Sequence, residues 1–470
     1  MNDHLQLTPQ QQEAIDQIKK FLQLPGQAFF ILKGYAGTGK TTMLQELAHY
    51  LEDSQIEFSL LAPTGRAAAV LSAKTGFSAR TIHSELYHFK DIDGDAPAEK
   101  ESTEVEDYGQ MRLLFQIRQA DENSEKVYIV DEASMIGDER SDETSFASFG
   151  SGHLLTDFLT LVGSNKVIFA GDPCQLPPVG SDDSPALTVD FFKNLGKEVH
   201  SYELTHILRQ KQDSDVLKLA TQIRRMTSIT FKSKWVKIPA KTTENIQLVG
   251  FDQMKEMYIE DLLANGTDQI TAISQSNLNC HHINLEVRKH LYGNAHSPLQ
   301  AGDLLMVTQN NYIVPLTNGD FVEILEVGNP LTVKGINFVE VTVKARLTGK
   351  AHQIILCLEP LHNGRTNLNL EQQRLLMIDF SQRMRTKKIK PKTDIYFAAM
   401  QKDPILNSLR ANYGYAVTCH KSQGGEWEKI YFFLQKGMYV MNPPSLTRWW
   451  YTGVTRAKEK LVLAQDWWIG

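Results

Sequence analysis

A glycine-rich segment, GYAGTGKT at residues 34–41, has the residue types needed to hold a chain of phosphates. Gly34, Gly37 and Gly39 let the backbone wrap around a phosphate with its amides pointing inward. Lys40 then places an ammonium on the β and γ oxygens, and the Thr41 hydroxyl binds Mg²⁺. The segment therefore predicts a site for a nucleoside triphosphate and its metal.

A second segment, VYIVDEAS at residues 127–134, places two acids directly after an apolar run. If this run is a strand, Asp131 reaches the Mg²⁺ shell and the adjacent Glu132 polarises the attacking water as a general base. A solvated turn is the plain alternative for two acids after a strand. Together with the phosphate loop, the pair favours hydrolysis of the bound nucleotide.

Three further residues are candidates to contact the terminal phosphate. Gln175, in GDPCQLPPVG, follows another apolar run, from which its amide can contact the γ-phosphate or the water. Arg209, in ELTHILRQ, and Arg456, in GVTRAKEKL, are candidate arginine fingers, because a planar guanidinium stabilises the charge on a transferring phosphoryl group. So many distant blocks around one nucleotide indicate a motor rather than a simple binding fold.

The segments that must position these residues alternate between helix and strand patterns. Residues 8–22 predict a helix with Thr8 as its N-cap and Pro9 at its first position. Residues 41–53 predict an amphipathic helix. Apolar runs that end in polar turns recur at 28–34, 58–65, 126–134 and 165–172. The alternation predicts an α/β fold with a doubly wound parallel sheet that binds ligands at the carboxyl ends of its strands.

Two stretches interrupt this alternation. Residues 90–110 are acidic and poor in apolar side chains, which predicts a projecting hairpin or a mobile insertion. Between about 296 and 400, runs of Val, Ile and Phe broken by Asn-Gly and Gly-Asn predict a small antiparallel barrel. Because residues 413–434 and 460–465 return to the α/β style, we expect the barrel to be inserted within a second α/β domain.

Composition limits the class of protein. A chain of 470 residues that is 42% hydrophobic and 22% charged is long enough for about three globular domains. Its N-terminus lacks the pattern of a signal peptide, and no apolar run approaches the ~20 residues of a bilayer span, which argues against export and membrane insertion. The four cysteines are too scattered for a zinc site or a disulfide framework, which indicates a reducing compartment such as the cytoplasm.

A net charge of −6 argues against coating of duplex DNA by bulk electrostatics but not against a local groove for a single strand. Two basic runs occur, at 224–237, with Phe231 and Trp235 among the cations, and at 382–392. Cations interleaved with aromatic residues suit a phosphate track with stacking faces. A solvated loop is the commoner explanation of such a run.

Six blocks in fixed order carry a family resemblance: GYAGTGKT, APTGRAA (62–68), VYIVDEAS, FAGDPCQLPPVG (169–180), TCHKSQGGEW (418–427) and YTGVTRAKEKL (451–461). The chain resembles superfamily 1 helicases over nearly its whole length, in particular the 5′-to-3′ branch that includes RecD-like and phage Dda-type enzymes. The resemblance implies two RecA-like P-loop NTPase domains that bind ATP and Mg²⁺ between them. It implies a first domain at 1–190 with a strand-separating pin at 88–125, a second at 191–295 and 401–470, and an SH3-like accessory insertion at 296–400.

The same resemblance implies roles for individual residues. Gln11, in LTPQQQEAI, recognises adenine, with Gln10 and Gln12 as neighbouring alternatives, and Glu426 faces the ribose. The phosphate loop set is Gly34, Ala36, Gly37, Thr38, Gly39, Lys40, Thr41 and Thr42. The residues implied to contact single-stranded DNA are Pro63, Thr64, Arg66, Thr81, His83, His420, Lys421 and Ser422. Helix capping or turn formation is the alternative role for the polar residues of the first DNA-binding blocks.

The expected function is therefore an ATP-dependent DNA helicase that moves 5′ to 3′ on single-stranded DNA and opens duplex junctions, acting as a monomer. Lys40, Thr41, Asp131, Glu132 and Gln175 are expected from the first domain, and Arg209 and Arg456 from the second. Two alternatives remain open. One is an RNA helicase or remodeller of the same superfamily, and the other is a nucleotide-switched DNA-binding module that does not unwind.

Overall fold

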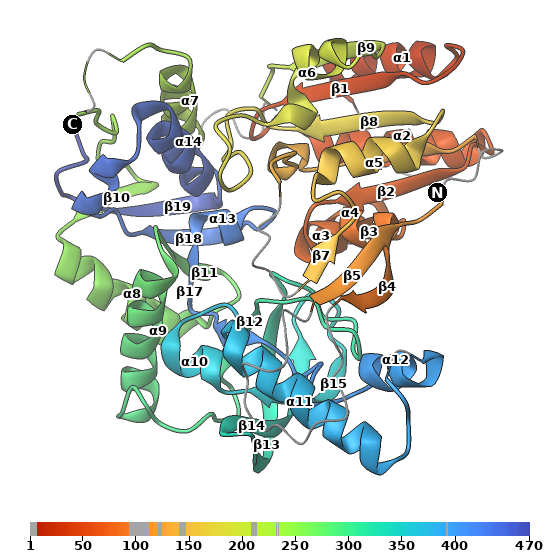
Figure 1. The fold of residues 1–470 in the computed structure, drawn as a ribbon. Coiled ribbons are helices and arrows are strands. Elements are labelled where there is room, and N and C mark those ends of the chain that lie inside the picture. Colours follow the sequence, from red (N-terminus) through yellow and green to blue (C-terminus); the bar gives the residue numbers. More distant parts are fainter. Residues whose placement is uncertain are drawn as a thin grey trace.

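The computed structural model describes residues 7–93, 112–119, 125–140, 147–207, 214–231, 233, 235–391 and 393–470. Two parallel sheets lie side by side, and an antiparallel sheet lies below them in the view of Figure 1. A three-stranded sheet extends from the first parallel sheet toward the antiparallel one. All four cysteines are buried and free. No helix in the described part of the chain is both long and apolar enough to cross a membrane.

The first sheet is parallel throughout, as the alternating pattern of the sequence predicts, with the strand order β3-β2-β6-β8-β1-β9. Its strands are Phe29–Gly34 (β1), Phe58–Ala62 (β2), Ala79–Thr81 (β3), Val127–Val130 (β6), Lys166–Gly171 (β8) and Val199–Leu204 (β9). Its helices are Pro9–Leu22 (α1), Lys40–Asp53 (α2), Gly65–Thr75 (α3), Ile82–Leu86 (α4), Leu154–Val162 (α5) and Val189–Asn194 (α6), with short 3-10 turns at Ala133–Met135 (η2) and Pro185–Leu187 (η3).

Strand β1 shows how the first sheet is buried on both faces. Phe30 and Leu32 pack with α1 and α2, whereas Phe29 and Ile31 pack with α5 and α6. All four side chains are at most 1% exposed. Burial of apolar surface contributes about 25 cal/mol per Å². This packing fixes the carboxyl end of β1, where the phosphate loop begins.

The second sheet is also parallel, with the strand order β10-β19-β18-β11-β17. Helices α7 and α14 pack on one face, and α8 and α9 pack on the other. Its strands are Ile246–Val249 (β10), Ile270–Ser274 (β11), Ala416–Thr418 (β17), Trp427–Phe432 (β18) and Ala457–Ala464 (β19). Its helices are Asp215–Thr227 (α7), Phe251–Asn265 (α8), Asn277–Tyr292 (α9), Cys419–Ser422 (α13) and Pro443–Val454 (α14), with a 3-10 helix at Lys436–Val440 (η5).

The antiparallel sheet has the strand order β15-β14-β13-β12-β16. Leu409, two residues before β16, donates its N–H to Ile355 O (2.7 Å), and its carbonyl accepts from Cys357 N–H (3.0 Å). These bonds bridge the two edges of the sheet and curve it toward a closed ring. The strands are Leu304–Val307 (β12), Phe321–Val333 (β13), Ile336–Ala345 (β14), Ala351–Cys357 (β15) and Ala411–Tyr413 (β16).

Two strands lie beyond the domain boundaries expected from the sequence. β9 ends at Leu204 and belongs to the first sheet, although residue 190 is the expected end of the first domain. β16 belongs to the antiparallel sheet, although residue 400 is the expected end of that insertion. Both expected boundaries come too early in the sequence, because the strands β9 (VHSYEL) and β16 (ANY) are short and contain few apolar residues.

The insertion also contains helices that the sequence does not predict. They are Glu359–Asn363 (α10), Leu370–Thr386 (α11) and Asp394–Gln401 (α12). The basic run at 382–392 therefore begins within α11 and is not a continuous loop. Its Arg383 is bonded to Asp379 (2.7 Å) and Asp403 (2.5 Å), so this cation serves the fold.

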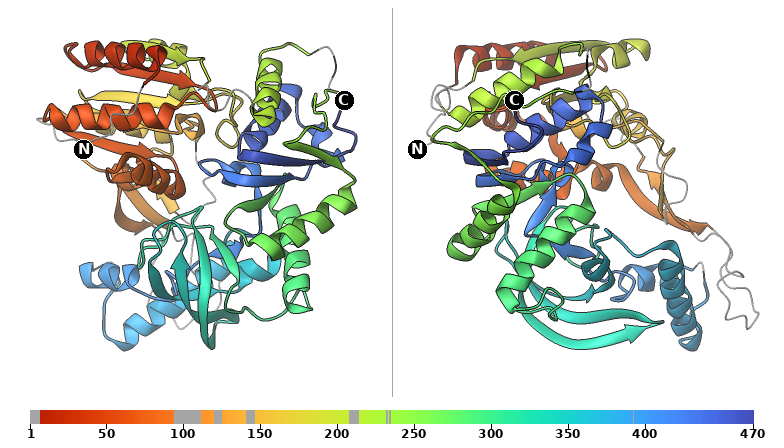
Figure 2. Two further views of the ribbon diagram at one scale, coloured as in Figure 1. Left: turned by 180° about the vertical axis from the view of Figure 1, so that it is seen from behind. Right: turned by 90° about the vertical axis from the view of Figure 1, so that its left-hand side faces the viewer.

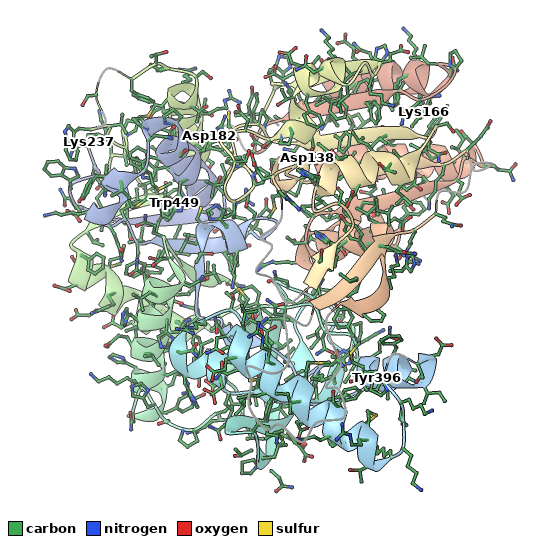
Figure 3. All side chains as sticks on the ribbon, in the orientation of Figure 1. Asp138, Lys166, Asp182, Lys237, Tyr396 and Trp449 are labelled. Atoms are coloured by element: carbon green, nitrogen blue, oxygen red, sulfur yellow. The ribbon has the colours of Figure 1, made fainter. Side chains whose placement is uncertain are left out.

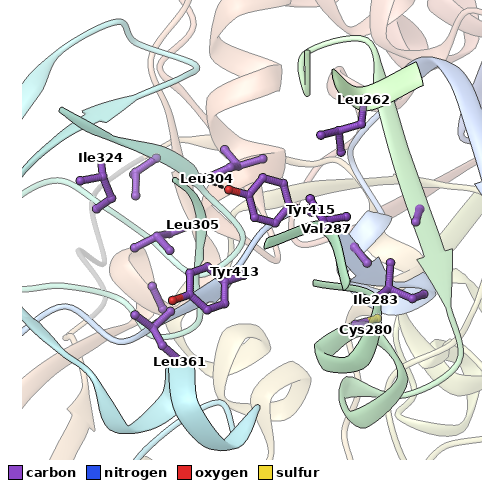
Figure 4. Close-up of a cluster of buried hydrophobic side chains, with 14 of the residues drawn as sticks. Leu262, Cys280, Ile283, Val287, Leu304, Leu305, Ile324, Leu361, Tyr413 and Tyr415 are labelled. Carbon is purple, nitrogen blue, oxygen red and sulfur yellow. Dashed lines mark hydrogen bonds between the residues drawn. The ribbon is translucent and has the colours of Figure 1, made fainter. Parts of the chain in front are cut away.

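A shared hydrophobic core joins the second parallel sheet to the antiparallel sheet (Figure 4). Ile283 and Val287 of α9 contribute from one side, and Leu304 and Leu305 of β12 from the other. Tyr415 spans the junction, because its hydroxyl accepts the Leu304 N–H (3.3 Å). The two sheets form one packed unit.

The small sheet consists of Tyr87–Asp93 (β4), Arg112–Ile117 (β5) and Ala147–Phe149 (β7). β4 and β5 pair antiparallel and point away from the first sheet, as the right-hand view of Figure 2 shows. Much of the expected pin at 88–125, including residues 94–111, lies outside the described residues. At the base of the pair, Phe89 contacts Phe397 of α12 with ring centroids 5.4 Å apart. The small sheet thus rests on the helices of the insertion.

Candidate nucleotide site and nucleic-acid interface

The phosphate loop joins β1 to α2. Gly37 and Gly39 have φ values of 81° and 74°, in the left-handed region that glycine adopts without steric cost. The Lys40 ammonium folds back over the loop, where it donates to Gly34 O and lies 3.4 Å from Tyr35 O. The expected phosphate-loop residues lie together in this loop and the first turn of α2: Gly34, Ala36, Gly37, Thr38, Gly39, Lys40, Thr41 and Thr42.

Gln11 lies beneath this loop and supports it. Its amide group donates to Thr38 O (3.0 Å) and Gly39 O (3.4 Å), and its oxygen accepts the Thr8 N–H (2.9 Å) in a capping box at the start of α1. The neighbouring Gln10 instead accepts two backbone amides after β9. Gln11 therefore links α1 to the loop that surrounds the phosphates.

The two acids after β6 lie in different environments. Asp131 is 8% exposed, and its carboxylate accepts the Glu132 N–H (2.9 Å). Burial raises the pKa of Asp131, and the charge of Glu132 raises it further. Glu132 has φ of 51° and ψ of 35°, a left-handed conformation that costs on the order of 1–3 kcal/mol for a residue with a side chain. Its Oε2 is buried without a protein partner, so this strained residue presents an acceptor atom for a ligand or water.

Few protein groups are available to hold a metal here. Within the described ranges, no three His, Cys, Asp or Glu side chains gather into a metal cluster. Mg²⁺ usually keeps several waters and takes one or two protein oxygens beside phosphate oxygens. Thr41 and Asp131 therefore fit the Mg²⁺ of a nucleotide better than a resident metal.

Gln175 lies on a loop after β8 that contacts both halves of the molecule. It is 4% exposed, and its Oε1 is buried without a protein partner, as is Oε2 of Glu132. On the same loop, Asp172 accepts the hydroxyl of Tyr451 from α14 (2.7 Å). That hydroxyl accepts the N–H of Ala36 in the phosphate loop (3.0 Å). Tyr451 thus connects the second sheet to two nucleotide-binding loops of the first.

Neighbouring contacts strengthen this connection. Leu176 N–H donates to the Thr452 hydroxyl (2.9 Å), and Leu176 O accepts the side-chain amide of Gln423 (3.2 Å). The guanidinium of Arg224, on α7, lies 4.0 Å from the ring centroid of Tyr35 in the phosphate loop. Movement of one sheet against the other must break or rearrange these contacts.

Of the two candidate arginine fingers, the structure describes Arg456 but not Arg209. Arg456 is 5% exposed and donates to Thr452 O (3.0 Å) and Gly425 O (3.3 Å), both within its own half of the molecule. Arg209 lies outside the described residues, and it follows β9 of the first sheet rather than a strand of the second. The expected ribose contact, Glu426, is exposed on the loop before β18.

The first of the expected DNA-binding blocks form helix N-termini. Thr64 follows the half-buried Pro63 and caps α3 by accepting the Ala67 N–H (3.2 Å). Thr81 caps α4 by accepting the Ser84 N–H (3.2 Å). His83 packs against aromatic rings, and burial lowers its pKa. The capping alternative is therefore observed for both threonines, and their DNA contact stays a prediction.

Arg66 lies between the two halves of the molecule. Its guanidinium is 4.7 Å from the ring centroids of both Phe321 and Trp427. Burial lowers the pKa of Arg66 to about 10, an effect that Asp320 opposes. One of its terminal nitrogens is buried without a partner. In this conformation Arg66 is an inter-sheet contact whose remaining donor is available to a ligand.

In the block at 418–422, one polar side chain is hydrogen-bonded within the protein and another has no partner. Ser422 is 0% exposed and donates to Cys419 O (2.7 Å), so the structure does not place it at a DNA-binding surface. Lys421 has a buried ammonium without a partner, and desolvation lowers its pKa to about 8. His420, whose pKa burial also lowers, is half-buried beside it.

The described geometry agrees with two family models. Residues 6–232 match a model of the AAA domain, and residues 413–464 match a model of the UvrD-like helicase C-terminal domain. The chain therefore carries both domain types, and it is similar to superfamily 1 helicases of the RecD-like and Pif1-like branch. The two matched segments contain the phosphate loop and Arg456, so the models cover both sides of the candidate site.

Relatives of known structure share the fold. Pif1 helicase from Bacteroides, in a complex with ADP-AlF3 and single-stranded DNA, has a TM-score of 0.51 at 17% identity, with coverage of 99% of this chain and 95% of that one. A second Pif1 structure, described as the basis for DNA unwinding at forked duplex DNA, has a TM-score of 0.52 at 17% identity, with coverage of 98% and 92%. The two parallel sheets correspond to the RecA-like domains of that fold.

Curated relatives also match by sequence. The ATP-dependent RecD2 DNA helicase of Deinococcus radiodurans is 24% identical over 94% of this chain. The chain spans 47% of the length of that relative. An uncharacterized protein of Acanthamoeba polyphaga mimivirus is 23% identical, with coverage of 96% of this chain and 98% of its own length.

Sequence reasoning missed the residues that join the two halves. Tyr451, Thr452, Asp172 and Gln423 all lie within blocks that the sequence analysis singles out, yet none is selected there. Their only signal is position beside a motif residue, because an aromatic or Thr side chain on a helix more often packs in a core.

Proposed function

We propose that this protein is an ATP-dependent DNA helicase that moves 5′ to 3′ on single-stranded DNA, driven by Mg-ATP hydrolysis between its two RecA-like domains. The observation that carries the proposal is the pair of buried, unpartnered oxygens at Glu132 and Gln175. Both lie on loops at the carboxyl ends of strands in the sheet that holds the phosphate loop. Such acceptors are suited to a hydrolytic water.

The proposed chemistry assigns each group one task. The amides of the phosphate loop and Lys40 hold the phosphates. Thr41 and Asp131 would hold Mg²⁺, which would neutralise negative charge on the phosphates. Glu132 accepts the proton of the attacking water, and Gln175 orients that water. Arg456 must leave its backbone acceptors to reach the transferring phosphoryl group, and we assign Arg209 the same role in stabilising it.

We propose that nucleotide hydrolysis moves one sheet against the other through Tyr451. Its hydroxyl holds an amide of the phosphate loop and the carboxylate of Asp172, so rearrangement of phosphates at the loop alters a contact with α14. The unit formed by the second sheet and the insertion then moves along the strand.

We propose that single-stranded DNA runs across the two sheets and into a cavity of about 810 Å³ between the small sheet and the insertion. Aromatic and cationic side chains line it, as stacking and phosphate contacts require: Tyr87, Phe89, Phe115, Arg118, Tyr312 and Arg410. Both Pif1 relatives are described with DNA, single-stranded in one case and forked in the other. Lys421 and Arg66 are assigned to the same strand.

The domain assignment follows the sheets. We propose a first RecA-like domain that ends after β9, a second formed by residues on either side of the insertion, and an SH3-like accessory unit that extends through β16. We propose that β4 and β5 form the base of the strand-separating pin. Replacing residues 92–108 by a short flexible linker is expected to weaken duplex unwinding while sparing DNA-stimulated ATP hydrolysis.

Two measurements test the proposal. ATP hydrolysis is measured alone, with single-stranded DNA and with RNA at equal nucleotide concentration, and only DNA is expected to stimulate it. Duplexes with either a 5′ or a 3′ single-stranded tail are then mixed with the protein, ATP and Mg²⁺. The 5′-tailed duplex is expected to open and the 3′-tailed duplex to stay closed. Stimulation by RNA alone would favour an RNA remodeller, and opening of the 3′-tailed duplex alone would refute the proposed direction.

A further inference from the structure

An exposed row of aromatic rings lies on the second half of the molecule, and none of its residues takes part in the contacts described above between the two parallel sheets. Trp235, Tyr439 and Trp467 come from three separate segments, and their exposed fractions are 48%, 47% and 46%. The ring of Trp235 is 6.1 Å from that of Tyr439 and 5.7 Å from that of Trp467. Lys237 continues the row, with its ammonium 4.6 Å from the ring centroid of Trp467. We call these four residues the aromatic row.

The backbone beneath the aromatic row is fixed by buried neighbours. Ile238 and Trp468 are both 0% exposed, and Ile238 N–H donates to Trp468 O (2.7 Å). Side chains alternate along these segments, so Trp235 and Lys237 face outward when Ile238 faces inward. The buried neighbours therefore hold the backbone in place, and this backbone keeps the rings at the surface.

Exposed aromatic surface of this extent is costly to a chain that only needs to fold. Each ring loses the burial that contributes about 25 cal/mol per Å², and adjacent exposed rings mark interaction sites. Tyr and Trp rings in a row suit successive nucleobases, because every base has a face that can stack.

The segment that carries Trp235 and Lys237 has a charge that suits a polyanion. The segment from residue 224 to residue 243 contains no Asp or Glu in a chain whose net charge is −6. Its cations are Arg224, Arg225, Lys232, Lys234, Lys237 and Lys241. Of these, Lys237 is part of the aromatic row, where its ammonium can move from the Trp467 face to a phosphate. Residues 224–237 of this segment form one of the two basic runs of the sequence, and Arg224 contacts Tyr35 in the phosphate loop.

The row faces away from the proposed path of the translocated strand. Figure 3 shows Lys237 at the outer edge of the second half, on the side away from Asp138 of the first half. None of the four aromatic-row residues lines the 810 Å³ cavity. A segment of strand bound here is therefore distinct from the segment in the cavity.

We propose that the aromatic row is a second binding site for single-stranded DNA, which holds a part of the strand outside the 810 Å³ cavity. The inference rests on the proposed function for the identity of the nucleic acid. It assigns base stacking to Trp235, Trp467 and Tyr439 and a phosphate contact to Lys237. A long strand that occupies both sites binds more tightly than a short one, because the second contact is intramolecular.

The test compares oligo(dT) of about 8 nucleotides, which fills one site, with oligo(dT) of about 30 nucleotides, which reaches both. Affinities are measured on the full chain by fluorescence anisotropy at one salt concentration. Trp235→Ala combined with Trp467→Ala is expected to weaken binding of the long strand at least about fivefold, which corresponds to about 1 kcal/mol. Binding of the short strand, and the ATP hydrolysis that it stimulates, are expected to change less than twofold.

Two control variants keep the result interpretable. Trp235→Phe combined with Trp467→Phe keeps stacking faces and is expected to retain most of the affinity for the long strand. Phe251→Ala removes another exposed aromatic side chain (40% exposed) on α8 and is expected to have no effect. Long-strand binding by the double alanine variant at the wild-type level would overturn the inference and leave the surface to a protein partner. Equal loss for both strand lengths would also overturn it.

Failure of the helicase proposal would give a different result from failure of the second-site proposal. If no strand stimulates ATP hydrolysis by the wild-type protein, the helicase proposal fails, whereas the difference between long and short strands is measured by binding alone. The two proposals are therefore tested separately.

Discussion

The nucleotide site and the expected DNA-binding blocks use their polar atoms in opposite ways. At the nucleotide site, Glu132 and Gln175 keep oxygens without protein partners. In the DNA-binding blocks, Thr64 and Thr81 cap helices, and Ser422 is bonded within its own turn. The first region keeps acceptor oxygens available to a ligand, whereas the second uses these hydroxyl groups to hold the fold and leaves nitrogens of Arg66 and Lys421 without partners. A polar residue in a motif therefore indicates ligand contact only where its atoms remain available.

The largest expected effect follows from Glu132. Glu132→Gln keeps size and hydrogen bonding but removes the base, so we expect ATP hydrolysis to fall about 10²–10⁴-fold with nucleotide binding intact. Hydrolysis and equilibrium binding of a fluorescent ATP analogue measure the two effects. Lys40→Ala serves as the contrast, because it should lose binding as well. Hydrolysis at the wild-type rate by Glu132→Gln would contradict the assignment of Glu132 as the general base.

Arg456 differs from Glu132 and Gln175, because its donors are engaged in this conformation. If it moves to the phosphoryl group, Arg456→Lys should slow hydrolysis about 10³-fold while nucleotide affinity is kept, since lysine retains the charge but not the planar fork. Thermal unfolding is measured in parallel. A large fall in melting temperature with near-normal hydrolysis would instead assign Arg456 a structural role.

Tyr451→Phe tests the connection between the sheets. The variant keeps the buried ring and removes only the hydroxyl shared by Ala36 and Asp172, so we expect DNA-stimulated hydrolysis to fall about tenfold, the equivalent of about 1.4 kcal/mol. Basal hydrolysis should change less. Tyr396→Phe removes a hydroxyl bonded to Ser381 far from the site and is the matched control. Equal loss of basal and stimulated hydrolysis would contradict a role in coupling.

Lys421 predicts a pH dependence of DNA binding. Its pKa is lowered to about 8, so the ammonium is lost as pH rises from 7 to 9, and the affinity for single-stranded DNA should fall about threefold beyond the background change. Lys421→Arg stays charged over this range and should not show the loss. An identical pH profile for both proteins would exclude Lys421 from the DNA contact.

The smallest effect is expected at Ser422. Ser422→Ala removes the bond to Cys419 O and should lower the free energy of unfolding by about 1 kcal/mol, with DNA affinity unchanged. Denaturant unfolding and anisotropy measure the two quantities. Weaker DNA binding at unchanged stability would restore Ser422 to the DNA-binding surface and contradict the structure.

Local rules made part of this architecture predictable. The helix that begins after Thr8, the strands β1, β2, β6 and β8 of the first sheet and the glycine loop are confirmed, because capping, apolar runs and left-handed glycines are encoded within a few residues. Contacts between distant segments were not predictable. Nothing near Tyr451 in the sequence indicates Ala36, which lies 415 residues away. The sequence does not predict helices α11 and α12, because the strand-like pattern that begins near residue 296 is taken to continue to residue 400.

The short link between β16 and β17 determines which parts of the molecule unfold together. Only Gly414 and Tyr415 separate the two strands, and a Cβ on Gly414 would come within 3.1 Å of Leu305 and Phe321. The antiparallel sheet and the second parallel sheet therefore cannot melt independently, and their amides should exchange with solvent as a single cooperative block. The first parallel sheet has its own two cores, so heating should release it in a separate transition.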